Sequence, residues 1–221
     1  MKVYGEIIFD IIYLIIAIFF GINILINSKN KTQKLIGLSV LILGCGDAFH
    51  LIPRILNNFT NKNLDAYLGI GKLVTSITMT IFYIFMYYIY LLIYKEKENK
   101  NLTRMIIILS LIRIILCLFP QNDWLTNNSP LIWGIIRNIP FIILGVILII
   151  LFFNKRKDNS ILKPIWLYIT LSFLFYIPVI IGTKSIPILG MLMLPKTICY
   201  ILIIITLKKY IKQEVKENKY A

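Results

Sequence analysis

The sequence predicts an all-α integral membrane protein, a bundle of seven transmembrane helices, and three observations lead to this prediction. The mean hydropathy is +0.80, and 58% of the 221 residues are hydrophobic, against about 45–50% in an ordinary soluble domain. Apolar runs of about 20 residues, long enough to cross a bilayer, recur along the chain. Lysine and arginine gather in every second connection between these runs, which is typical of a polytopic topology.

Seven apolar runs define the expected helices, and the polar segments between them are short enough to be loops. Because no long polar segment separates the runs, we expect residues 1–221 to form a single transmembrane domain. The spans are expected at about 6–27, 35–56, 66–94, 104–120, 131–153, 164–183 and 187–207.

The basic residues predict the orientation of the bundle. Sixteen of the 24 lysines and arginines follow the first, third or fifth span or lie in the C-terminal tail, and only Lys2, Lys62 and Lys184 fall on the opposite side. The positive-inside bias then puts the N-terminus outside and the C-terminus in the cytoplasm. The net charge of +14 does not indicate nucleic-acid binding, because these residues punctuate the spans and form no basic stripe. A multi-pass protein of the plasma membrane is expected, and the abundance of isoleucine, lysine, asparagine and tyrosine indicates a bacterial source.

Polar residues inside the first two spans are the first sign of a site. Asp10, near the outer end of the first span, is either an interfacial acid or a partner for a cation within the membrane. In the second span, Asp47, His50 and Arg54 are spaced i, i+3, i+7, so a helix puts them on one face. Glycines in the same span favour close helix packing, and they are Gly37, Gly44 and Gly46.

Later spans add further polar groups at helical spacing. Lys72, Ser76 and Thr80 lie four residues apart in the third span and form one polar stripe. The fourth span carries Arg113, the fifth carries Arg137 with Asn138, and the seventh carries Lys196. Ionisable residues within membrane spans are costly and rare, so by default they mark functional sites.

The depth of these residues predicts a cavity. With a rise of about 1.5 Å per residue, all five cations of the spans lie within about 14 Å of the outer face. Residues that merely extend to the nearest interface should not favour one leaflet so consistently. We therefore expect an outward-facing polar cavity, with ligand-binding candidates Asp47, His50, Arg54, Lys72, Ser76, Arg113, Arg137, Asn138 and Lys196.

The charge of this layer indicates an anionic ligand. Five basic groups face one strong acid, Asp47, with Asp10 as a second acid nearby. Unpaired cations in lipid are costly, and a bound anion compensates them. We expect a small anion, or an anionic amphiphile such as a lipid headgroup, to be bound and either transported or sensed. Because histidine titrates near neutral pH, Asp47 and His50 are candidates to couple protons to binding.

An enzyme and a purely structural role remain as alternatives. In a membrane-embedded hydrolase for a lipid or phosphoester, Asp47 would orient His50 as general base and Ser76 would be the nucleophile. One turn of one helix between Asp47 and His50 disfavours that geometry. In a structural role, Asp47 would pair with one lysine and the other cations would reach interfacial water. A single histidine and three dispersed cysteines predict no metal site, and no cofactor is expected.

A weak internal repeat is also visible. Shifting the chain by 124 residues superposes Gly21 on Gly145 and Lys72 on Lys196, so that spans one to three match spans five to seven. Asp47 and His50 have no counterparts under this shift. Chance combined with shared topology explains so few matches better than duplication does.

Overall fold

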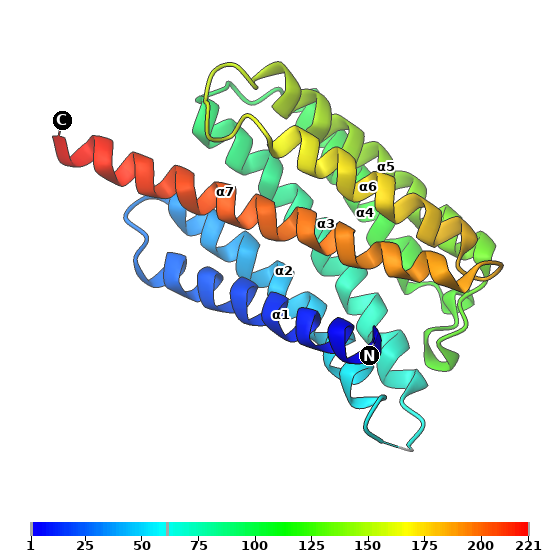
Figure 1. Cartoon of the computed structure of the whole chain (residues 1–221). Helices are drawn as coiled ribbons and strands as arrows, with labels where there is room; N and C mark the ends of the chain where they lie inside the picture. The colour runs from blue at the N-terminus through cyan, green and yellow to red at the C-terminus, as the bar shows by residue number, and fades with distance from the viewer. Residues whose placement is uncertain (1, 61, 221) are drawn as a thin grey trace.

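Seven long α-helices make up almost the whole of the computed structural model, which describes residues 2–60 and 62–220 (Figure 1). No β-strand occurs in these two ranges. All seven helices are long and apolar enough to cross a membrane, which agrees with the predicted all-α bundle of seven membrane-length helices. The helices are α1 (Lys2–Ile26), α2 (Lys31–Leu56), α3 (Asp65–Tyr94), α4 (Lys100–Leu118), α5 (Leu131–Asn154), α6 (Ile165–Gly182) and α7 (Met193–Tyr220).

The last helix differs most from the prediction at its ends. Residues Pro187–Leu192, expected to begin the seventh span, form the short 3-10 helix η3 instead. Beyond residue 207, α7 continues to Tyr220. Apolar periodicity cannot mark this second boundary, because a helix that leaves the apolar layer needs only good helix formers, and this tail is rich in lysine and glutamate.

The helices pack as two consecutive sets of three, with α4 beside the contact between them. Helix α2 packs against α1 and α3, and α6 packs against α5 and α7. The sets meet where α3 contacts α5 and where α7 runs along α1 (Figure 1). We name the end of the bundle with connections 57–64, 119–130 and 183–192 the cavity end. The opposite end, with connections 27–30, 95–99 and 155–164, is the lysine-rich end.

Glycines allow α2 and α3 to approach closely. A Cβ added at Gly71 of α3 would overlap the carbonyl oxygen of Phe49 and the Cα of His50. A Cβ at Gly46 of α2 would overlap the side chain of Thr78. Lipid supplies little hydrophobic force between helices, so close contact of this kind contributes much of their association. The same contact sets how far His50 lies from α3.

An aromatic layer fills the bundle between the cavity described below and the lysine-rich end. The ring of Tyr83 lies 4.9 Å from Phe141 and 5.7 Å from Phe173, centroid to centroid. Its hydroxyl lies 3.4 Å from that of Tyr200. Edge-to-face pairs of this kind contribute about 0.5–1.5 kcal/mol each beyond their buried area. We name Tyr83, Phe141, Phe173 and Tyr200 the aromatic layer.

Polar contacts tie the connections together at the lysine-rich end. The ammonium of Lys155 lies 2.6 Å from Glu96 and 3.2 Å from Asp158. Hydrogen bonds to these two carboxylates raise the pKa of Lys155 above its ordinary value. On the other side of this end, Gln33 donates to the Glu214 carboxylate of α7 across 2.8 Å. The Lys155–Glu96 and Gln33–Glu214 contacts join segments that are distant in sequence.

Gly71→Ala should lower the free energy of unfolding by about 1–3 kcal/mol, because the added methyl group forces α2 and α3 apart. Unfolding of the purified protein in detergent, followed by circular dichroism against temperature, measures the loss. Gly5→Ala is the matched control, because nothing lies within 4 Å of a Cβ at that position of α1. Equal stability of the two variants would contradict the close α2–α3 contact.

Candidate functional site

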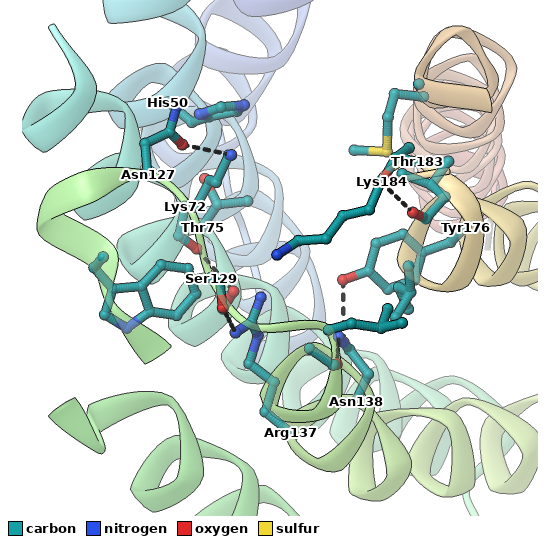
Figure 2. Close-up of a pocket in the computed structure, with 18 of the residues that line it drawn as sticks. His50, Lys72, Thr75, Asn127, Ser129, Arg137, Asn138, Tyr176, Thr183 and Lys184 are labelled. Carbon is teal, nitrogen blue, oxygen red and sulfur yellow. Dashed lines mark hydrogen bonds between the residues drawn. The ribbon is translucent and has the colours of Figure 1, made fainter. Parts of the chain in front are cut away.

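A cavity of about 590 Å³ lies at the cavity end of the bundle, and residues of α2 to α7 line it. Figure 2 shows Lys72 on one side of this space and Arg137 and Asn138 of α5 on another. Seven of the nine predicted binding residues line the cavity, namely His50, Lys72, Ser76, Arg113, Arg137, Asn138 and Lys196. The sequence therefore located seven of the 25 lining residues, including four of its five lysines and arginines, although it did not establish what the cavity binds.

Arg54 does not line the cavity, and the expectation that it would do so is wrong. Its guanidinium lies 2.6 Å from the carboxylate of Glu6 and 3.7 Å from that of Asp10, both on α1. Of the two roles considered for Asp10, the structure therefore supports that of an ion-pair partner. At about 100° per residue, His50 lies about 40–60° around the helix from Arg54 and Asp47. That rotation is enough to turn His50 toward α3 while the other two face α1.

Asp47 also lies outside the cavity lining. The hydroxyl of Tyr13 on α1, a residue with no exposed surface, donates a hydrogen bond to its Oδ2 across 2.5 Å. Lys196 of α7 is close enough for the two charges to attract each other, although they form no direct ion pair. Asp47 thus lies behind the cavity and bears on it through Lys196.

The connection between α4 and α5 holds three cations at the cavity. Lys72 donates to Asn127 across 2.6 Å, and Lys184 donates to Asn128 across 3.2 Å. Arg137 donates to Asn122 across 2.6 Å, and it also donates to Ser129 across 2.7 Å (Figure 2). Every acceptor in this set is neutral, so each cation keeps its net charge.

This connection is itself anchored. The side chain of Asn122, with no exposed surface, donates to the carbonyls of Leu116 and Phe119 across 2.7 and 2.9 Å. The indole of Trp124 donates to the carbonyl of Cys117 across 2.8 Å, and its ring lies 4.4 Å below the Arg137 guanidinium. The acceptors are therefore held in place before any ligand arrives.

Sequence reasoning missed these acceptors and also Lys184. Lys184 was counted only as a loop charge that reports topology, yet it lines the cavity. Asn122, Asn127 and Asn128 lie in the connection after the fourth span, where the sequence has no apolar periodicity. The sequence therefore does not predict where their side chains point. The one available signal was the run Asn127-Asn128-Ser129, three neutral acceptors in a loop that lacks a basic residue.

Two cations of the cavity are almost completely enclosed. Arg113 is 2% exposed, its guanidinium carbon lies 3.4 Å from the centre of the Phe141 ring, and its Nε and Nη1 have no hydrogen-bond partner. Lys196 is 6% exposed, and its ammonium lies 4.2 Å from the Tyr176 ring. Aromatic faces attract cations, but they do not neutralise them. A buried charge without a counter-charge is costly.

The residues considered for hydrolysis do not form a catalytic triad. Ser76 donates to the carbonyl of Lys72 in its own helix across 2.7 Å, and Asp47 accepts from Tyr13. The Nδ1 of His50 is buried and has no partner. Hydrogen bonds from nucleophile to base and from base to acid, which nucleophilic catalysis uses, are therefore lacking among these three residues.

The described part of the chain holds no group of three or more histidine, cysteine or acidic side chains that could bind a metal ion. The three cysteines are free, with Cys117 and Cys199 buried and Cys45 exposed on α2. The lining offers cations, amides, hydroxyls, aromatic rings and the imidazole of His50. No protein family, curated protein or solved structure matches this chain.

Tyr13→Phe should lower the free energy of unfolding by about 1–3 kcal/mol, because it leaves the Asp47 carboxylate without its hydrogen-bond donor. Denaturation in mixed micelles, followed by tryptophan fluorescence, measures this difference. Tyr4→Phe removes the same hydroxyl from a residue that is 65% exposed and should change little. A Tyr13→Phe protein as stable as the Tyr4→Phe protein would show that the hydrogen bond contributes nothing.

Proposed function

We propose that this protein binds a small anion or an anionic amphiphile in the cavity and transports or senses it at the membrane. One observation carries the proposal. Five cations line the cavity, and no aspartate or glutamate occurs among its described lining residues. The five are Lys72, Arg113, Arg137, Lys184 and Lys196.

The physical reason is the cost of holding these charges together. Like charges repel strongly where the surroundings have a low dielectric constant, and Arg113 and Lys196 are nearly buried. An anion bound between them removes this repulsion and gains charge-assisted hydrogen bonds. The volume of about 590 Å³ falls within the range of about 300–1,000 Å³ common for small-molecule sites. A small organic anion therefore fits the site better than a single halide ion.

We propose that the cavity end lies at the outer face of the plasma membrane. The connections at the lysine-rich end, the helix ends beside them and the C-terminal tail carry 16 of the 24 basic residues, and such residues tend to remain in the cytoplasm. The ligand would then enter from outside. The aromatic layer lies between the cavity and the lysine-rich end, so transport would require that layer to open.

Single cysteines should report this orientation in cells. In a variant that lacks the three native cysteines, Asn58→Cys at the cavity end should react with a membrane-impermeant maleimide in intact cells. Lys157→Cys at the lysine-rich end should react only after permeabilisation. Both positions are exposed, so accessibility within the protein is matched. The reverse labelling pattern would invert the proposed topology.

Binding should depend on the cavity cations and not on basic residues elsewhere. Arg137→Gln and Lys196→Gln should each weaken anion binding by about 10- to 100-fold, because each removes a charged hydrogen-bond donor. The measurement is thermal stabilisation of protein in neutral-lipid nanodiscs by phosphate, succinate, citrate and dodecyl phosphate. Arg104→Gln, an exposed position on α4 near the lysine-rich end, should bind like wild type. A wild-type protein stabilised by none of these anions would overturn the proposal.

Transport and proton coupling call for a second assay on the same protein. A carrier should move a bound anion into proteoliposomes, whereas a sensor should bind it without flux. We propose that Asp47 couples protons to binding, because an anion that attracts Lys196 takes away the counter-charge of Asp47 and favours its protonation. An imposed pH gradient, acidic outside, should then raise uptake by wild type but not by Asp47→Asn. Equal stimulation of both proteins would exclude coupling through Asp47.

A further inference from the structure

The cations within the membrane helices at the cavity end fall into two classes, those close to a carboxylate and those that are not. Arg54 pairs directly with α1 carboxylates. Lys72 reaches Asp65 through one bridging amide, because Asn127 accepts from Lys72 across 2.6 Å and donates to Asp65 across 3.3 Å. Helix α7 contacts α2, and the charge of Asp47 on α2 attracts Lys196 on α7, although the two side chains form no direct ion pair. Each of these three cations therefore has an acid of the protein to balance it.

The two arginines of the cavity have no such acid. Arg137 contacts the neutral oxygens of Asn122 and Ser129 and the face of Trp124. Arg113 rests on Phe141, and two of its nitrogens have no partner. Neither guanidinium lies within ion-pair distance of a carboxylate in the described ranges. Two positive charges are thus left over inside the bundle.

The two arginines lie on neighbouring helices, α4 and α5, which pack against each other. Arg113 of α4 packs on the ring of Phe141, and Phe141 lies four residues after Arg137 on α5. Residues with this spacing occupy the same face of a helix, about 6 Å apart along its axis. Both arginines line the same cavity, so one small molecule can reach both.

We infer that the ligand is a dianion whose two negative charges engage Arg113 and Arg137, an inference that rests on the proposed binding function. Either one doubly charged phosphate group or two neighbouring carboxylates has this chemistry, and guanidinium groups bind both through paired hydrogen bonds. The lysines add little uncompensated positive charge, because Lys72 and Lys196 each have a carboxylate of the protein to offset their charge. Lys184 is exposed, and water can solvate it.

The sharpest test compares ligands of one skeleton that differ by a single charge. Ethyl phosphate, a dianion above pH of about 7, is paired with diethyl phosphate, a monoanion, and succinate is paired with its monomethyl ester. Dissociation constants are measured at fixed ionic strength on the full chain in neutral-lipid nanodiscs. We expect each dianion to bind at least about ten-fold more tightly than its monoanion. Equal affinities within both pairs would overturn the inference while leaving anion binding intact.

Variants assign the preference to the arginines. Arg113→Gln and Arg137→Gln should each reduce the ratio of monoanion to dianion dissociation constants to about one, because one guanidinium remains. Lys72→Gln, the matched control, should weaken both members of a pair and leave the ratio unchanged. A ratio that survives both arginine variants would overturn the assignment. Because the wild-type ratio needs no variant, the inference stays testable even if one variant fails to fold.

Two further outcomes separate the possible ligand sources from failure of the whole proposal. Dodecyl phosphate that binds much more tightly than ethyl phosphate would identify a phosphorylated lipid headgroup as the dianion. Similar affinities for both would identify a soluble dianion, and either result agrees with the inference. No binding of any member of the panel would overturn the proposed function itself.

Discussion

The cavity depends on one constraint, that its cations are held by neutral oxygens and aromatic faces rather than by carboxylates in direct contact. Asparagine and serine side chains orient a cation without cancelling its charge, as Asn127 does for Lys72 and Ser129 does for Arg137. A ring such as Phe141 under Arg113 does the same. The nearest acids do not contact the cations directly. Asp65 is linked to Lys72 through the amide of Asn127, and Asp47 lies on α2 outside the cavity lining. Positive potential therefore stays in the cavity, while the turns of α1 and α2 at the cavity end hold their charges in direct ion pairs.

Contacts outside the cavity, together with some of its lining residues, maintain this arrangement. The α4–α5 connection can supply acceptors to three cations because Asn122 and Trp124 tie it to the end of α4. The close contact of Gly71 with α2 sets the distance between His50 and the third helix. Below the cavity, the aromatic layer keeps it separate from the lysine-rich end. Rigid surroundings reduce the cost of ordering side chains when a ligand binds.

Apolar runs and helical spacing predicted much of this arrangement. A run of about 20 apolar residues has few alternatives to a membrane helix, so the seven helices followed from composition and length. Polar residues within such helices avoid lipid, which explains why Arg113, Arg137 and Lys196 turn toward one interior space. Helical spacing alone gave the wrong surroundings for Arg54, because one face of α2 is wide enough to contact two neighbouring helices, α1 and α3. Nothing in the second span reveals that α1, with Glu6 and Asp10, lies on that side.

The sequence by itself determined that this chain forms apolar membrane-length helices with a surplus of cations toward one end, because these properties depend on composition and on the helical period. Only the tertiary structure decided which charges balance each other. Arg54, Lys72 and Lys196 look alike in the sequence as lone cations in apolar spans, yet each has an acid nearby in space, and Arg113 and Arg137 do not. Pairing depends on which helices are neighbours and on the path of an irregular connection, and neither follows from local pattern.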